Sequence, residues 1–124
     1  MINPVHKGKR GEDEFCNWIK KSFGIDVRRE HFQADGHSAD IRIKDFLFEV
    51  KRHEKPNRDN FWYQVAIAGQ HDNDNIIPVV AFRENRKPWK FLLPAKLIGV
   101  ELGYIELNEK VFIKFAKSII NNDS

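Results

Sequence analysis

The sequence predicts a mixed α/β domain in which helices flank a central β-sheet. Two observations support this prediction. Apolar residues with helical spacing occur near both ends of the chain, and short apolar runs with strand-like alternation lie between them. A length of 124 residues suits one hydrophobic core, so we expect residues 1–124 to form a single domain with the element order αβββαββα.

The first expected helix covers residues 12–23, whose apolar side chains recur at three-and-four spacing and which Gly24 follows as a natural stop. A short strand is expected at residues 27–31. The segment that follows is turn-like and has Asp35-Gly36 as its break. Two alternating runs then predict a β-hairpin, with strands at residues 39–43 and 46–52.

The second half of the chain predicts two helices and two strands. Residues 61–70 are expected to form a largely buried helix with Asn60 as its cap, and residues 109–120 a helix capped by Asn108. The apolar runs between these helices are the expected strands, at residues 76–82 and 89–93. Trp89 and the lone cysteine, Cys16, are expected in the core.

The hairpin carries two acids that its alternation does not require. If the chain turns at Lys44 and Asp45, Asp40 faces Glu49 on the side opposite to the apolar residues, and Lys51 points to the same side. Like charges at a Cβ separation of about 5 Å destabilise a strand pair unless something neutralises them. A divalent cation would do so, and oxygen ligands suit Mg²⁺ or Mn²⁺.

Two alternatives remain open for the hairpin. Its polar side is also compatible with a solvated surface that carries cross-strand ion pairs. The turn also lacks the usual Asn-Gly signal, so a register slip of one residue would move Asp40 to the other face.

The first expected helix offers a further acid. Glu12 lies within about 60° of the apolar stripe, whereas Glu14 lies about 200° away from Glu12. An inward acid needs a partner, which a metal would supply, although a first-turn acid also favours the helix dipole. Which of the two glutamates is the ligand stays open.

Composition narrows the class of protein. The net charge is +3, and residues 1–58 hold 13 Lys and Arg against 10 Asp and Glu, which hints at a polyanionic partner near the hairpin. On charge alone, a lysine-rich solvated surface stays the simpler interpretation. We expect a cytoplasmic protein, because no apolar run could span a bilayer and one cysteine suits a reducing compartment. The five histidines lack zinc-site spacing.

Three segments give the chain a resemblance to the PD-(D/E)xK nuclease superfamily, and within it to archaeal and phage Holliday-junction resolvases. They are KGKRGEDEF at residues 7–15, VRREHFQADGHSADI at 27–41 and FLFEVKR at 46–52. The later segment 76–92 resembles that family's second strand pair. The resemblance covers about residues 7–93 and implies a restriction-endonuclease-like fold and metal-assisted hydrolysis of DNA phosphodiesters.

The same resemblance assigns residue roles. It makes Glu12, Asp40 and Glu49 the metal ligands, with the main-chain carbonyl of Val50, and makes Lys51 the catalytic lysine. It also places Gln64 near the site, and matches Arg28 or Arg29 to the arginine before the family's loop. It implies a Mg²⁺ cofactor, with Mn²⁺ as a substitute, and a homodimer. Part of the aromatic triplet at residues 61–63, or of the C-terminal helix, is the expected dimer contact.

Basic residues on either side of the proposed site suit phosphate contacts. They are Lys7, Lys9, Arg10, Arg52, Lys55 and Arg58, with Arg86 and Lys87 in a later basic turn. The expected function is a Mg²⁺-dependent endonuclease that resolves four-way DNA junctions. Two rivals stay open: a nuclease for duplex, nicked or flapped DNA, and a nucleic-acid-binding module that does not cleave.

Overall fold

The structure, a computed structural model, describes residues 4–28, 32–34, 39–52, 57–68, 76–84 and 87–121. Side chains are described within residues 11–28, 32, 40–51, 57–64, 76–84 and 87–120. Among these residues, no helix has both the length and the apolar character needed to cross a bilayer.

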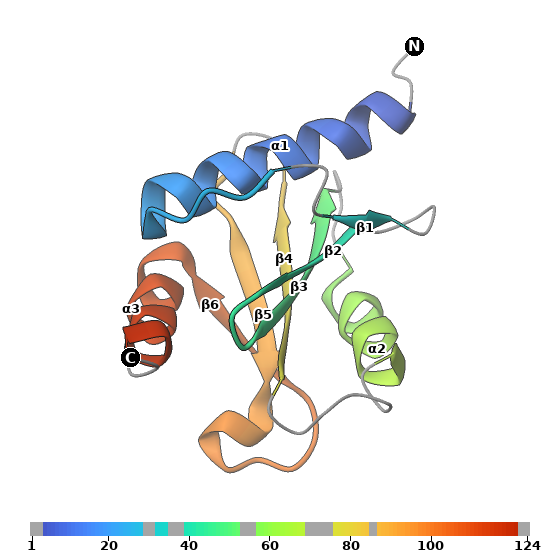
Figure 1. Cartoon of the computed structure of the whole chain (residues 1–124). Coiled ribbons are helices and arrows are strands. Elements are labelled where there is room, and N and C mark those ends of the chain that lie inside the picture. The colour runs from blue at the N-terminus through green and yellow to red at the C-terminus, as the bar shows by residue number, and fades with distance from the viewer. Residues whose placement is uncertain are drawn as a thin grey trace.

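The chain forms a mixed six-stranded sheet flanked by three α-helices (Figure 1). In chain order the elements are α1 (Pro4–Phe23), β1 (Gln33–Ala34), β2 (Ala39–Ile43), β3 (Phe46–Arg52), α2 (Arg58–Ala68), β4 (Ile77–Arg83), β5 (Lys90–Pro94), the 3-10 helix η3 (Ala95–Ile98), β6 (Tyr104–Asn108) and α3 (Glu109–Asn121). The strands lie in sequence order, and every neighbouring pair is antiparallel except β3 and β4. That parallel pair needs a crossover connection, which includes α2.

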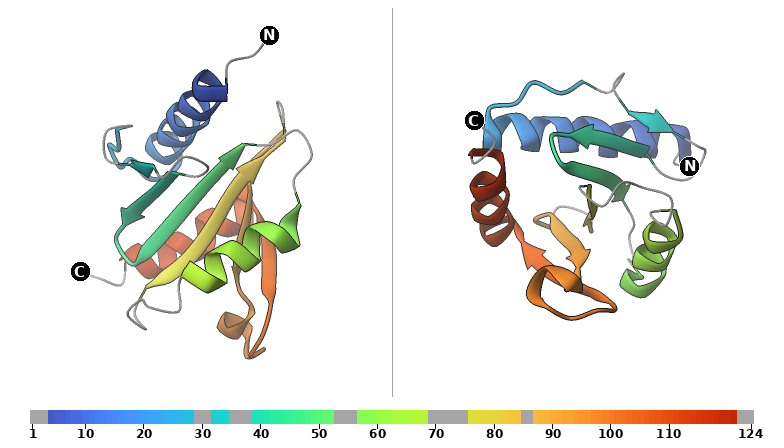
Figure 2. Two further views of the ribbon diagram at one scale, coloured as in Figure 1. Left: turned by 90° about the vertical axis from the view of Figure 1, so that its right-hand side faces the viewer. Right: turned by 60° about the horizontal axis from the view of Figure 1, so that its bottom comes forward.

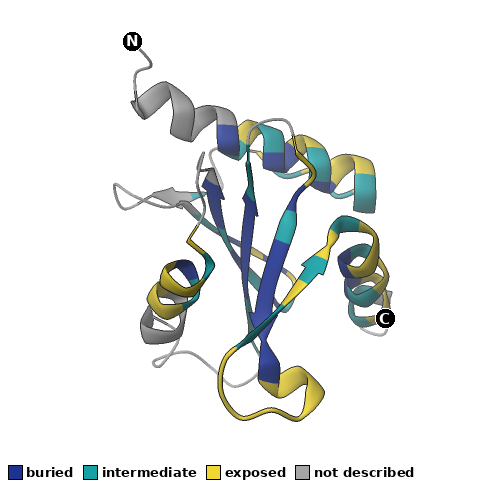
Figure 3. Ribbon diagram, turned by 180° about the vertical axis from the view of Figure 1, so that it is seen from behind, coloured by how far each residue is buried: buried dark blue, intermediate teal, exposed yellow. Residues whose placement is uncertain are grey.

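The helices pack on the two faces of the sheet, and the hydrophobic cores beneath them differ in size. Helices α1 and α3 cover one face and α2 covers the other, as the views in Figures 1 and 2 agree. Figure 3 shows that burial is concentrated in the central strands, while the η3 loop at the end of β5 is exposed.

The face covered by α1 and α3 holds the larger core, which is rich in aromatic rings. Phe112 of α3 is fully buried and stacks on Phe91 of β5, with ring centroids 4.1 Å apart and planes 10° apart. Phe15 of α1 packs against Phe48 and Trp89 in the same core. Because flat rings from two helices and the sheet interlock here, both helices are fixed on this face.

The β2–β3 hairpin has the predicted register. Ile43 faces Phe46, Ile41 faces Phe48, and Asp40 faces Glu49. The turn has no Gly or Asn at its first position, so Lys44 itself adopts a left-handed backbone with φ of 55°. The apolar side chains of the hairpin reach the core only in this register. The free energy gained by burying them outweighs the roughly 1 kcal/mol of strain at the turn.

Most other predicted elements are confirmed to within a few residues, and the predicted caps are partly confirmed. Gly24 ends α1 with a φ of 71°, and the Asn108 side chain accepts a hydrogen bond from the Val111 amide at 2.9 Å. Asn60 is not a cap. Helix α2 starts earlier, at Arg58, and the amide of Asn60 donates a hydrogen bond to the Asn57 side chain at 3.1 Å.

Two predicted elements are misplaced, and one strand was missed. Helix α1 begins at Pro4 rather than residue 12, since proline at a first helical position is pre-organised for helix and the two glycines that follow do not break it. Residues 27 and 28 form no strand, residues 29–31 lie outside the described part, and β1 is instead Gln33–Ala34. Strand β6 was not predicted, because its YIELN run is short and half exposed and becomes a strand only by pairing with β5.

Candidate active site

The candidate active site begins with the carboxylates of two adjacent strands. Asp40 of β2 and Glu49 of β3 are directly paired in the sheet, so their side chains emerge on the same face. This is the face that α2 covers, because Lys51, two residues beyond Glu49, contacts α2 side chains. The position of all three side chains therefore follows from one hairpin register.

Lys51 is the one charged residue that is buried among the described side chains, with 6% of its surface exposed. Its Nζ atom donates a hydrogen bond to Oε1 of Gln64 at 2.6 Å and lies 3.5 Å from Oε1 of Glu49. The same Nζ lies 4.9 Å from the centre of the Phe61 ring. A buried ammonium needs such partners, and here a carboxylate, an amide and an aromatic face supply them together.

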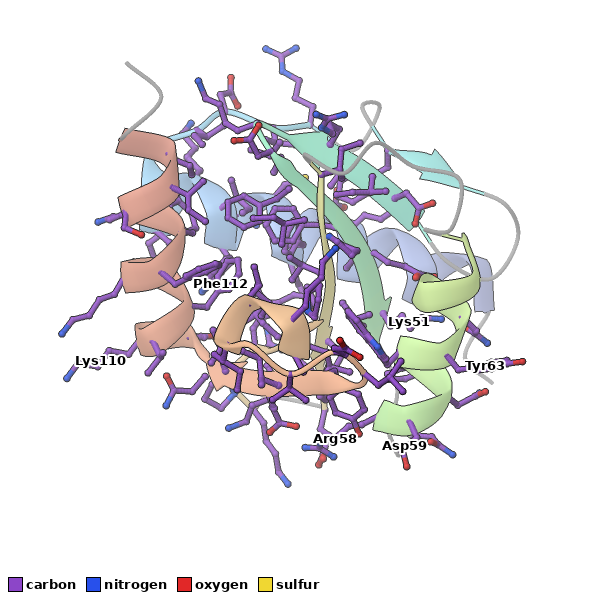
Figure 4. The ribbon with its side chains drawn as sticks, turned by 90° about the horizontal axis from the view of Figure 1, so that it is seen from below. Lys51, Arg58, Asp59, Tyr63, Lys110 and Phe112 are labelled. Atoms are coloured by element: carbon purple, nitrogen blue, oxygen red, sulfur yellow. The ribbon has the colours of Figure 1, made fainter. Side chains whose placement is uncertain are left out.

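Helix α2 sets the position of Lys51 (Figure 4). Phe61 and Gln64 are three residues apart, so they lie on the same side of the helix and approach Lys51 together. Phe61 is anchored in the smaller core with Val80, Phe82 and Leu92. Phe61 had not been singled out from the sequence as a site residue, although its spacing from Gln64 was the available signal.

The two acids of α1 have different surroundings. Glu14 forms an ion pair with Arg83 at the end of β4, with Oε2 and Nη1 3.5 Å apart, and Arg83 also lies over the Trp89 ring at 5.5 Å. Glu12 lies about one turn before the buried stripe of Phe15, Cys16 and Ile19 as predicted, and is half-buried. That stripe packs on the sheet face opposite to Lys51.

The donor atoms at the site suit a hard divalent cation. Two carboxylates from neighbouring strands are enough for Mg²⁺, which keeps several waters and takes one or two protein carboxylates. Among the described side chains, however, no three His, Cys, Asp or Glu residues gather into a group that could hold a metal ion, so Glu12 does not join Asp40 and Glu49. The side chain of Val50 is buried on the other face, which leaves only its main chain for the predicted ligation.

The structure describes the side chains of only some of the predicted DNA-binding residues. Arg28 is exposed just after α1, and Lys87 is exposed and donates to Glu84 at 2.8 Å, which lowers the pKa of that carboxyl group. Lys7, Lys9 and Arg10 lie on α1 and Arg52 on β3, but their side chains are outside the described part, as are Arg29, Lys55 and Arg86 altogether.

Arg58, which was predicted to contact phosphate, makes contacts within the protein. It donates a hydrogen bond from Nε to Glu106 of β6, which raises the pKa of the guanidinium, and it lies 5.1 Å from the centre of the Phe82 ring. Beside it, Tyr104 of β6 donates to Asp59, which raises the pKa of the tyrosine. These contacts tie the start of α2 to β6 and so support the helix that holds Lys51.

The aromatic residues are more buried than the dimer prediction required. Phe61 is buried, Trp62 packs against Tyr104 with ring centroids 6.0 Å apart, and of the triplet only Tyr63, 64% exposed, projects into solvent. Trp89 is buried, as predicted.

No family model, curated protein or solved structure matches this chain.

Proposed function

We propose that the protein is a metal-dependent nuclease with a restriction-endonuclease-like fold. The observation that carries the proposal is the environment of Lys51, a buried ammonium held by Gln64 and Phe61 beside Glu49, with Asp40 facing that carboxylate across the hairpin. A lysine that only balanced charge on a solvated strand would lie in water. An ammonium fixed in this way can stabilise negative charge that develops on a bound anion.

The chemistry proposed is hydrolysis of a DNA phosphodiester. When bound, Mg²⁺ would activate a water and polarise the scissile phosphate. Asp40 and Glu49 would hold the cation, and Lys51 would offset the negative charge that develops on the phosphorane oxygens. Gln64 and Phe61 would keep the ammonium in place throughout, because both contacts come from one rigid helix.

Within this class, we propose a nuclease that cuts branched DNA, most like a Holliday-junction resolvase, working as a homodimer with Mg²⁺ or Mn²⁺. The support is the resemblance of residues 7–15, 27–41 and 46–52 to the segments of that family. A nuclease for duplex, nicked or flapped DNA would use the same residues.

A second candidate function has its own support. Lys51 and Glu49 already form an ion pair at 3.5 Å, although within β3 rather than across the hairpin as the sequence alternative had it. With that pair formed, the domain would bind nucleic acid without cutting it.

One experiment separates these functions. The protein is incubated with labelled four-way junction, linear duplex and single-stranded DNA, in Mg²⁺ or in EDTA. Symmetric nicks in the junction arms that require Mg²⁺ are the expected result, and cutting of linear DNA would favour the broader nuclease. Asp40→Asn should abolish cleavage while binding persists. Retention of DNA with no cut in any metal condition would leave only the binding module.

A further inference from the structure

The solvent face of α3 carries a stripe of lysines that the proposed active site does not use. Lys110, Lys114 and Lys117 are all exposed. Successive helical residues turn by about 100°, so the three side chains fall within an arc of about 60° and span about 10 Å of the helix axis. The stripe lies opposite to the buried residues Phe112 and Ala116.

The stripe has no stabilising role within the helix. Lysines that favour the helix dipole lie in the last turn, and α3 has no basic residue there. Lys110 is instead in the first turn, where a positive charge is unfavourable, and Lys110 and Lys114 are like charges at a spacing of four residues. The sole acid of α3, Glu109, accepts a hydrogen bond from the Trp89 amide at 2.8 Å and so is engaged elsewhere.

The neighbouring part of α1 extends the positive surface. Lys20 and Lys21 are exposed in the last turn of α1, and this end of the helix packs against α3 through Phe23 and Phe112, with ring centroids 6.5 Å apart. Exposed lysines at the adjoining parts of two packed helices are complementary to a phosphate backbone. Such a surface is also unsuited to a symmetric dimer contact, because the stripe would face its own copy.

The stripe and the candidate active site lie on opposite sides of the molecule. Helices α2 and α3 flank different faces of the sheet (Figure 1), and Figure 4 shows Lys51 beside α2 and Lys110 projecting outward from α3. A single straight duplex bound at Lys51 would therefore not reach the stripe on the other side of the sheet. A DNA with diverging arms can reach both surfaces.

We propose that Lys110, Lys114 and Lys117 hold a second arm of a branched DNA while the first arm lies at the Lys51 site. This inference rests on the proposed function for its choice of DNA as the polyanion. It specifies the substrate further, because it requires two duplex arms that meet at an angle.

Binding in EDTA tests the inference apart from catalysis. Dissociation constants for a four-way junction and for a linear duplex of matched length are measured between about 50 and 200 mM salt. Each change to Gln in the stripe should lower the slope of log K against log salt for the junction by about 0.9, the loss expected for one phosphate contact. The triple variant should bind the junction at least about tenfold more weakly at 150 mM salt, with a smaller loss for the duplex.

The matched control is Lys96→Gln, which removes one exposed lysine from η3, outside the stripe. Its slope should equal that of the unmodified protein. The inference is overturned if the control lowers the slope as much as a stripe variant, if junction and duplex lose affinity equally, or if the unmodified protein binds neither DNA. Unfolding curves that match those of the unmodified protein confirm that the variants fold.

The two proposals fail in different ways. If no metal supports cleavage but the stripe variants still lose junction affinity selectively, the nuclease proposal falls and the second DNA surface stands. If Mg²⁺-dependent cleavage occurs and the stripe variants bind and cut as the unmodified protein does, the second DNA surface falls and the nuclease proposal stands.

Discussion

Lys51 and Gln64 are 13 positions apart in the chain, and their side chains meet in a hydrogen bond of 2.6 Å between β3 and α2. The ammonium group also lies over the ring of Phe61, one turn earlier on the same helix. This contact makes the position of the candidate catalytic lysine dependent on how α2 packs on the sheet. Anything that shifts α2 should therefore change the proposed chemistry without touching the carboxylates.

Replacing Gln64 tests that dependence. Gln64→Leu removes the acceptor for Lys51 and should lower the DNA cleavage rate by roughly 10- to 100-fold, since a small displacement of a catalytic group costs about that much. Gln64→Glu keeps an oxygen in reach and should retain most of the activity. Single-turnover rates across pH 6–9 provide the measurement, and equal rates for Leu and Glu would show that the hydrogen bond does not matter.

The facing acids predict a metal-dependent stability. Because Asp40 and Glu49 are directly paired, Mg²⁺ bound there should stabilise the fold, by about 2.7 kcal/mol at 100 times its dissociation constant. Asp40→Asn should unfold no more easily than the unmodified protein in EDTA and should lose the response to Mg²⁺. Thermal unfolding with and without Mg²⁺ measures both, and a variant that still responds would place the cation elsewhere.

Glu14 should contribute to stability rather than to cleavage. Glu14→Gln breaks the ion pair with Arg83, whose Nε atom is buried without a hydrogen-bond partner among the described residues, and should cost about 1 kcal/mol of unfolding free energy. Glu12 does not gather with Asp40 and Glu49, so Glu12→Gln should keep Mg²⁺-dependent cleavage. Urea unfolding and cleavage are measured on both variants, and a loss of cleavage in Glu12→Gln would make Glu12 a metal ligand, as the resemblance implies.

Phe112 should be a central determinant of stability. It is fully buried and stacked on Phe91, so Phe112→Ala should lower the free energy of unfolding by about 3–5 kcal/mol. The neighbouring Val111 is 46% exposed, and Val111→Ala should change it by no more than about 0.5 kcal/mol. Urea titrations compare the two, and similar losses would contradict the described packing of α3.

Cys16 predicts how stability falls at high pH. Burial raises the pKa of its thiol from 9.0 to about 11. Because the folded-state pKa is the higher one, folding binds the proton more tightly, and this contribution to stability is complete below about pH 9 and is lost as pH rises to about 11. Cys16→Ala should lose less stability than the unmodified protein between pH 8 and 11, which denaturant unfolding at each pH measures. Parallel losses would show that the pKa of the thiol is the same in the folded and unfolded states.

The sequence by itself determined the hairpin. Alternation at period two, with a turn at Lys44 and Asp45, puts Ile41, Ile43, Phe46 and Phe48 on one side and Asp40 opposite Glu49. The turn residues left a slip of one residue open, and the burial of all four apolar side chains excludes it. It also determined α3 and its Asn108 cap, because helical periodicity and capping are local properties.

Tertiary structure alone decided the rest. Strand β6 exists because β5 pairs with it, and its own short run carries too little pattern to specify a strand. Likewise, the burial of Lys51, the contacts from Phe61 and Gln64, and the separation of the α3 lysines from that site depend on which sheet face each helix covers. Periodicity shows which side of a helix is buried, but the packing of a helix on a particular face is a long-range choice that only the assembled core makes.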